Sequence, residues 1–271
     1  MTAMASSSSR HSDIGRRFAQ AAATYDGAAV LQRGIAESLL AQTQRLLPSP
    51  SSNERWIDVG CGTGYLTQRL ARQRAPHAGP LWGIDIAHPM LLQARSSRSN
   101  AIQWLQADAA RLPFSTDSVD RFYSSLALQW LDDLGLFLEE AYRCLRPGGW
   151  LSFSTLGDDT LRELRQLQQQ VSGQPHPSSF MSVERLCETL HHSALQLSHH
   201  RRQSFCCHYA DVIQLMRGLS RLGAQGPTPS QRGLKGRAWL RQLTAASDDV
   251  RAPQGIPARY DTHFVILHKP R

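Results

Sequence analysis

Short apolar runs alternate with helical periodicity through the middle of the chain. The runs predict five strands, at 56–60, 81–86, 102–108, 119–126 and 149–156. Between the strands, apolar residues recur at helical spacing and predict helices near 64–74, 89–98 and 134–145. Strands that alternate with helices in this way form a parallel sheet covered on both faces. We therefore expect an α/β fold.

The flanking segments add helices and a last strand. Residues 14–47 have helical periodicity, and helices are also predicted near 159–171, 182–191, 211–222 and 236–246. Strands are predicted near 194–205 and 260–268, and the second of them is expected to pair antiparallel at the edge of the sheet. We expect a single Rossmann-like domain over 14–271, with a seven-stranded, mostly parallel sheet, an antiparallel last strand, and helical lids near 14–47 and 209–249. The Ser-rich residues 1–13 are expected to be a disordered tail, with a transit peptide as the alternative.

The segment WIDVGCGTGYL, residues 56–66, reads as a strand, a glycine turn and a helix start. The residues of interest are Asp58, Gly60, Gly62 and Gly64. The G-x-G-x-G spacing differs from the G-x-G-x-x-G of dinucleotide sites, and no Lys-Ser or Lys-Thr pair follows to hold a phosphate. A ligand carboxylate suits the positive end of the helix, and Asp58 is placed to receive an ammonium group. A ligand that carries both groups is S-adenosylmethionine.

Two further strands end in acids. Asp85 ends the second strand, about 20 residues past the glycine turn, where such folds bind the hydroxyls of a ribose. Ile86 and Met90 follow it, and Met90 is placed to lie against an adenine. Asp108 and Ala109 end the third strand and are assigned to the adenine edge. Each acid alone could be a helix cap, but the three in order favour a binding site for S-adenosylmethionine.

The fourth strand ends in SSLALQW, which places Ser125, Gln129 and Trp130 at the same edge. We expect Ser125 to contact the cofactor and Gln129 and Trp130 to lie near the transferred methyl group, although Trp130 also suits a core or lid aromatic. Tyr25 lies in the N-terminal helical segment, which can fold over the cofactor as a lid. No N-P-P-Y-type motif for amino-group methylation follows the strand, so an oxygen acceptor is favoured.

Composition limits the partners and the compartment. The net charge is +8, and the basic residues gather late in the chain, where only Asp211 opposes them: Arg201, Arg202, Arg217, Arg221, Arg232, Lys235, Arg237 and Arg241. Nucleic acid, an acidic carrier protein or a merely solvated face would each explain this cluster. The five cysteines form no C-x-x-C pair and adjacent histidines share a metal poorly, so we expect no metal site and a cytoplasmic location.

Together these segments resemble the class I S-adenosylmethionine-dependent methyltransferases. The motifs DVGCGTG, GIDIAHPMLLQAR, ADAARLPF and LRPGGWLSFSTL carry that resemblance. AAATYDGAAVLQR, LALQW, FSTLGDDTLRELRQ and MRGLSRLGA resemble more closely the malonyl-acyl-carrier-protein O-methyltransferases of biotin synthesis. The similarity spans roughly residues 14–268. Relatives often carry L-K-G-x-G-A late in the chain, and here Ser220 stands in place of that lysine, beside Arg221.

The resemblance implies methylation of the free carboxylate of a malonyl group carried on acyl carrier protein or coenzyme A. It makes S-adenosylmethionine the methyl donor and an acidic carrier the partner, which the basic late segment would attract. Tyr25 would close over the donor, and Arg33 and Arg221 are the candidates for binding the malonyl carboxylate. We expect a monomer without nucleic acid or membrane partners. The alternatives are a small-molecule carboxyl methyltransferase of the aconitate type and a non-catalytic basic binding module.

Overall fold

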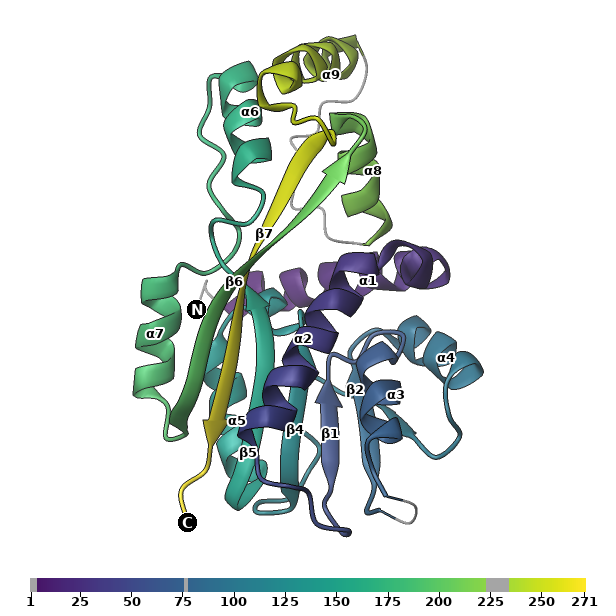
Figure 1. Ribbon diagram of the computed structural model, residues 1–271, viewed down its shortest axis with the longest axis vertical. Coiled ribbons are helices and arrows are strands. Elements are labelled where there is room, and N and C mark those ends of the chain that lie inside the picture. The colour runs from purple at the N-terminus through teal and green to yellow at the C-terminus, as the bar shows by residue number, and fades with distance from the viewer. Residues whose placement is uncertain (1–3, 76–77, 223–233) are drawn as a thin grey trace.

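The computed structural model describes residues 4–75, 78–222 and 234–271, of which residues 4–14, 23, 234, 235 and 237 are described without their side chains (Figure 1). Seven strands form one sheet in the order β3-β2-β1-β4-β5-β7-β6. Their bounds are β1 Trp56–Val59, β2 Leu81–Asp85, β3 Gln103–Gln106, β4 Val119–Ser125, β5 Leu145–Leu156, β6 Gln196–Tyr209 and β7 Ile256–His268. The first five strands are parallel, and β7 is antiparallel to both of its neighbours. The predicted α/β class and antiparallel last strand are confirmed.

The position of β7 differs from the prediction. It lies between β5 and β6, so β6 is the edge strand. The reason is burial: Phe264–Leu267 are all buried, as an interior strand requires, whereas β6 exposes the side chains of Arg201 and Arg202. The terminal strand is thus inserted beside β5, and β6 closes the sheet.

Helices cover both faces of the sheet. On one face lie α2 Val30–Leu46, α3 Tyr65–Arg72 and α4 His88–Ser97, and on the other lie α5 Leu134–Cys144 and α7 Val183–His192. Ile35 and Leu39 of α2 are fully buried against the first face, and Phe137 of α5 is fully buried against the second. Because α2 packs on the sheet, it differs from the lid expected over 14–47.

A further hydrophobic cluster, separate from those on the two faces of the sheet, lies around the ends of β6 and β7. The long ends of β6 and β7 extend past the other strands as a twisted ribbon that carries α6 Arg162–Ser172, α8 Val212–Arg221, α9 Leu234–Ala246 and the short helix η2 Ser247–Val250 (Figure 1). We call this group the lid unit. It includes α6, which lies outside the predicted lid ranges, and the predicted segment 223–233, with Arg232, lies outside the described residues.

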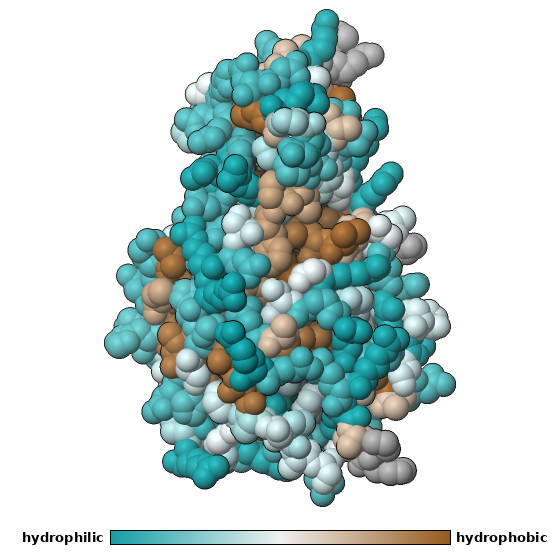
Figure 2. Space-filling model, in the orientation of Figure 1, coloured by the Kyte–Doolittle hydropathy of each residue, from teal (hydrophilic) through white to brown (hydrophobic). Residues whose placement is uncertain are grey.

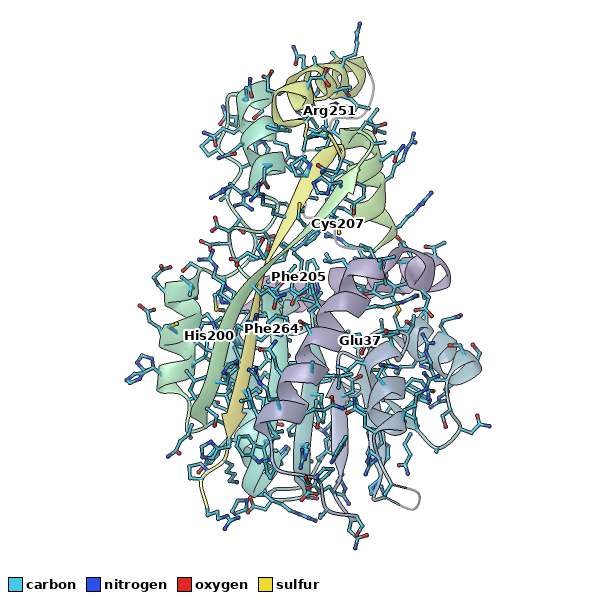
Figure 3. All side chains as sticks on the ribbon, in the orientation of Figure 1. Glu37, His200, Phe205, Cys207, Arg251 and Phe264 are labelled. Atoms are coloured by element: carbon cyan, nitrogen blue, oxygen red, sulfur yellow. The ribbon has the colours of Figure 1, made fainter. Side chains whose placement is uncertain are left out.

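Phe205 connects the lid unit to the sheet. It comes from β6 and packs against both the lid cluster and the cluster under α2. Its ring centroid lies 6.2 Å from that of Phe264 on β7, and both labelled side chains lie beside α2 (Figure 3). The ribbon is therefore fixed to the body of the protein by aromatic packing at its base.

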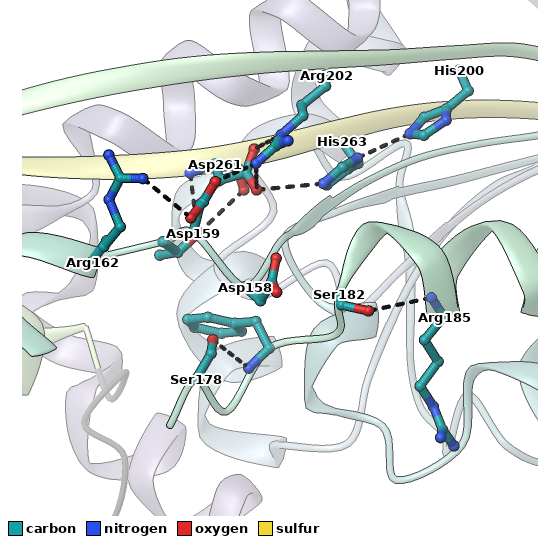
Figure 4. Close-up of polar contacts among 12 residues, drawn as sticks. Asp158, Asp159, Arg162, Ser178, Ser182, Arg185, His200, Arg202, Asp261 and His263 are labelled. Carbon is teal, nitrogen blue, oxygen red and sulfur yellow. Dashed lines mark hydrogen bonds and ion pairs between the residues drawn. The ribbon is translucent and has the colours of Figure 1, made fainter. Parts of the chain in front are cut away.

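A polar network holds the ribbon to the segment that leaves β5. Arg202 of β6 lies 2.7 Å from Asp261 of β7 and 2.6 Å from Asp159 (Figure 4). His263 is 1% exposed, and its Nδ1 lies 2.9 Å from Nε2 of His200. Burial raises the pKa of Asp261, but hydrogen bonds and charges from His263 and Arg202 outweigh it and hold the pKa at about 2. The aspartate is therefore ionised at neutral pH and keeps Arg202 in place.

The first helix, α1 Met4–Ala28, lies across the carboxyl ends of the strands, between the sheet and α8 (Figure 1). It begins at Met4, so most of the stretch 1–13, predicted to be a disordered tail, is helical. The stretch has no proline, and a helix nucleated by contacts further along can extend through it. None of the helices that the structure describes has the length and apolar character needed to cross a bilayer.

Candidate active site

A cavity opens where α1 crosses the carboxyl ends of β1, β2 and β4. We call it the main cavity. Most of the predicted cofactor residues line it: Asp58, Gly60, Gly62, Asp85, Ile86, Met90, Asp108, Ala109 and Ser125. Tyr25, Arg33 and Trp130 line it as well. Residues from four separate segments of the chain therefore meet at the edge that the strand pattern predicted.

The glycine turn brings the backbone to the cavity wall. Gly60 and Gly62 have φ of +66° and +54°, in the left-handed region that favours glycine. A Cβ on Gly60 would lie 2.2 Å from the Cβ of Ala127, whereas a Cβ on Gly62 would meet open space. Gly62 therefore faces the cavity and Gly60 packs below it. Gly64 does not line the main cavity, and a Cβ there would lie 2.4 Å from the Trp104 ring, so its role in this structure is packing.

Several N–H groups of the turn donate within the protein. Cys61 N–H donates to Ile84 O, Gly62 N–H to Asp85 Oδ2, and Gly64 N–H to Cys61 O, at 2.8–2.9 Å. The sequence predicts a ligand carboxylate at the positive end of the helix that follows the turn. These three N–H groups bind within the protein, two of them to β2 and the third within the turn.

Asp58 is a buried acid in the cavity wall with a strongly raised pKa. It is 1% exposed, and its Oδ2 accepts a hydrogen bond from Thr67 Oγ1 at 2.6 Å. Burial raises the pKa of Asp58 to about 7, the Asp85 charge adds to the rise, and the hydrogen bond from Thr67 opposes it. A buried carboxylate that needs a counter-charge fits a ligand ammonium or sulfonium group.

Asp85 accepts hydrogen bonds from two separate stretches of backbone. Its Oδ2 accepts from Gly62 N–H and its Oδ1 from Ala87 N–H, each at 2.8 Å. Burial raises the pKa of Asp85, and these backbone hydrogen bonds oppose the rise. Each carboxylate oxygen can accept a further hydrogen bond, so the pair of ribose hydroxyls that the sequence assigned to Asp85 can still be received there.

Three residues that the sequence pattern did not identify contact one another at the end of α1, and two of them, Asp26 and Thr63, line the main cavity. Asp26, in the last turn of α1, accepts a hydrogen bond from Thr63 Oγ1 at 2.5 Å. The same carboxylate lies 2.6 Å from the Arg98 guanidinium, whose Nε donates to Thr63 O at 2.9 Å. Asp26 thereby fastens α1 to the glycine turn. No local pattern marks this pairing, because Asp26 and Arg98 are 72 residues apart.

A second, smaller cavity adjoins the first, and we call it the side cavity. The two share Phe18, Tyr25, Gln32, Leu126 and Trp130. The other residues that line the side cavity come from α2, the short helix η1 Leu128–Trp130, β5, β7 and the lid unit with its connections: Leu31, Gln129, Leu156, Thr160, Leu161, Phe180, Leu219, Leu222 and Tyr260. Burial raises the pKa of Tyr25, helped by the charges of Asp85 and Asp26, so its hydroxyl stays protonated between the cavities.

Aromatic rings line the two cavities between α1 and the lid unit. The ring centroids of Phe18 and Trp130 lie 5.7 Å apart, and those of Trp130 and Phe180 lie 6.1 Å apart, both edge-to-face. Leu126, which both cavities share, has φ of +53°, a rare value for a leucine. Strained residues of this kind cluster at functional sites.

The remaining predicted residues lie in three different places in the structure. Gln129 lines the side cavity, where its Nε2 donates to Leu126 O and its Oε1 is buried without a hydrogen-bond partner among the described residues. Arg33 lines the main cavity, donates to Asp26 O, and lies over the Tyr65 ring at 5.4 Å. Arg221 ends α8, is exposed, and lines neither cavity. The two arginines assigned to the malonyl carboxylate are therefore in different places.

Comparison with known proteins agrees with this site. Residues 57–153, which include β1 to β4 and most of β5, match the family described as a methyltransferase domain. The chain is 34% identical over 269 residues to the malonyl-acyl-carrier-protein O-methyltransferase of Methylovorus sp., covering 95% of this chain and 88% of that protein. The chain belongs to this family of O-methyltransferases. S-adenosylmethionine is accordingly its methyl donor, and Asp58 and Gly62 leave a charged, open wall that fits it.

Relatives with a second function also occur in the family. The chain is 35% identical over 258 residues to the biotin biosynthesis bifunctional protein BioHC of Cellvibrio japonicus, covering 95% of this chain and 50% of that protein. The chain thus spans about half the length of the bifunctional relatives it matches.

A solved structure shows the same fold. It is the S-adenosylmethionine dependent methyltransferase from Mesorhizobium loti, with a TM-score of 0.53 and 20% identity, covering 88% of this chain and 99% of that chain. The predicted class I methyltransferase fold is confirmed.

Proposed function

We propose that this protein transfers a methyl group from S-adenosylmethionine to the free carboxylate of a malonyl thioester. One observation carries the proposal: the main cavity, with Asp58 and Asp85 at neighbouring strand ends, adjoins a smaller side cavity lined by apolar and neutral polar side chains. The methyl donor supplies an activated methyl group when it is bound. The protein's own contribution is to hold the two reactants in line and to exclude water.

The acceptor needs no general base, because a carboxylate is already ionised at neutral pH. This matches the site. Tyr25, between the two cavities, has a pKa raised by burial and by two nearby carboxylates, so it acts as a hydrogen-bond donor and not as a base. Trp130 and Phe18 pack edge-to-face beside it and limit the entry of water.

We propose that the partner is an acyl carrier protein. Arg217 and Arg221 lie exposed on α8, and Leu219 of the same helix lines the side cavity. An acidic carrier attracted to those arginines would thus arrive beside that cavity. The chain is further proposed to act as a monomer in the cytoplasm, without nucleic acid or membrane partners.

The test supplies labelled methyl donor with malonyl-acyl-carrier protein, malonyl-coenzyme A and free dicarboxylic acids in parallel. The proposal expects label on a malonyl thioester, released by mild alkali as a methyl ester is. The wild-type protein is compared with Asp58→Asn, which keeps the shape of the site and removes the charge. Label on free acids alone would contradict the malonyl thioester as the substrate.

A further inference from the structure

The side cavity is uncharged. Its lining among the described residues consists of apolar side chains and of neutral polar ones: Tyr25, Gln32, Gln129, Trp130, Thr160 and Tyr260. In the space-filling view, apolar residues gather at the waist of the molecule, where the lid unit meets the body (Figure 2). An anionic substrate that reaches this place therefore meets no guanidinium or ammonium group on the described wall.

Tyr260 is one of three residues of this cavity, with Gln32 and Gln129, that carry a buried polar side-chain atom without a hydrogen-bond partner of normal geometry among the described residues. The Tyr260 side chain comes from β7 and is 4% exposed, and its unpaired atom is the hydroxyl oxygen. Leaving a buried polar group unpaired costs about 1–3 kcal/mol, so such groups in a native structure call for an explanation. A ligand oxygen in the side cavity would supply the missing acceptor.

The chemistry of the proposed reaction favours neutral donors. A carboxylate oxygen forms a bond to the methyl carbon while the carbon–sulfur bond breaks and its electron pair stays on sulfur, and no proton moves. A negative and a positive charge disappear in this step. A cation beside the carboxylate would stabilise the reactant more than the transition state, in which the negative charge is already smaller, and would raise the barrier. O–H and N–H donors orient the anion with a smaller penalty of this kind.

We propose that the side cavity binds the acceptor carboxylate through uncharged groups, with the Tyr260 hydroxyl as a direct donor, and that Arg33 is not its ligand. This inference rests on the proposed function and identifies the binding residue. Arg33 does not line the side cavity, and its guanidinium donates to Asp26 O and lies over the Tyr65 ring. Its position supports α1 above the main cavity.

The state of Tyr260 agrees with a donor role. Burial raises the pKa of Tyr260, and the charge of the neighbouring Tyr209 and the contact with its hydroxyl add to the rise, so the phenol is protonated at neutral pH. Tyr209 itself lines neither cavity. It therefore offers a matched control, because Tyr209→Phe removes a hydroxyl next to Tyr260 without touching the cavity wall.

The experiment measures steady-state kinetics with malonyl-acyl-carrier protein at saturating methyl donor. Tyr260→Phe is expected to lower kcat/KM by about 10- to 100-fold, as the loss of one hydrogen bond to a charged group predicts. Its affinity for S-adenosylmethionine by calorimetry should stay within about twofold, and its unfolding temperature should change little, because within the protein the lost hydroxyl has only a contact with Tyr209. Tyr209→Phe should stay within about threefold of wild type.

Arg33→Gln provides the second variant. It is expected to weaken the affinity for the methyl donor while leaving KM for the malonyl thioester within about threefold of wild type at saturating donor. Unchanged kinetics in Tyr260→Phe, an equal loss in Tyr209→Phe, or a large rise of the malonyl KM in Arg33→Gln would each overturn the inference. A wild-type protein that labels no malonyl thioester would instead overturn the proposed function, so the two failures are distinguishable.

Discussion

Asp26 in the last turn of α1 accepts a 2.5 Å hydrogen bond from Thr63 in the glycine turn. The contact joins the helix that covers the main cavity to the backbone that forms its floor. Asp26→Asn removes the charge that also pairs with Arg98. Because the pair is partly exposed and worth about 1 kcal/mol, we expect affinity for S-adenosylmethionine to fall about three- to tenfold. Calorimetry measures this, and hydrogen exchange should be faster in α1 of the ligand-free variant.

The matched control is Asp248→Asn. Asp248 pairs with Arg251 at 3.2 Å in the lid unit, is 69% exposed, and lies outside both cavities. It should change neither the affinity nor the exchange of α1. Unaltered exchange in Asp26→Asn would show that the contact does not fasten the helix.

Binding of the methyl donor is predicted to depend on pH through Asp58. Burial raises the pKa of Asp58 from 3.8 to about 7, so the group is protonated at low pH and cannot pair with a cation. Affinity should therefore rise about tenfold per pH unit below about pH 6, about fivefold between about pH 6 and about pH 7, and then level off. In Asp58→Asn the affinity should be weak and independent of pH. A wild-type profile that is flat over this range would contradict the assignment.

The same shift predicts the stability of the free protein. Because the folded-state pKa of Asp58 lies above its unfolded value, the protonated carboxyl stabilises the fold at low pH, and this contribution is lost as the pH rises through about 7. Asp58→Asn should thus unfold at a higher temperature than wild type at pH 8 and show a smaller difference, or none, at pH 5. Scanning calorimetry at the two pH values checks the sign.

Asp85→Ala is predicted to weaken affinity for S-adenosylmethionine well over tenfold. The carboxylate is the expected partner of the ribose hydroxyls, each such bond being worth about 1.5–3 kcal/mol, and it also fixes Gly62 N–H. Asp85→Asn should lose less, because its amide oxygen can still accept one of these bonds. Equal affinities of Asp85→Ala and wild type in calorimetry would refute the role of Asp85.

Two alanine substitutions in the glycine turn should separate folding from binding. Gly60→Ala brings a Cβ to 2.2 Å from Ala127 at a positive φ, so we expect a loss of about 2–4 kcal/mol in the free energy of unfolding. Gly62→Ala has open space and only the positive φ, so we expect about 1–2 kcal/mol and a methyl group projecting into the main cavity. Urea unfolding and calorimetry measure both. Comparable destabilisation by the two changes would contradict the assigned geometry.

Local patterns in the sequence predict the fold and most of the main cavity. The acids and glycines that end β1, β2 and β3 are each recognisable within a few residues, and parallel strands bring those ends to one edge. The order of β6 and β7 was less accessible, because the pairing of strands that are distant in the sequence is a long-range choice. The continuous apolar run Phe264–Leu267 was the available signal for an interior strand.

The rest of the site depends on contacts between distant segments. Asp26 meets Thr63 across 37 residues, and Tyr260 reaches the side cavity only because β7 is inserted beside β5. No spacing rule predicts either contact. Arg33 and Arg221 were both candidates for binding the malonyl carboxylate because of their positive charge. The structure places Arg33 over the Tyr65 ring and Arg221 at the exposed end of α8.

The most direct test is mass spectrometry of malonyl-acyl-carrier protein after incubation with the protein and S-adenosylmethionine. The account predicts a mass gain equal to one methylene on the malonyl group, reversed by esterase treatment, with wild-type protein and a rate lowered at least tenfold with Asp58→Asn. A malonyl group that keeps its mass while S-adenosylmethionine is shown to bind would contradict the central claim.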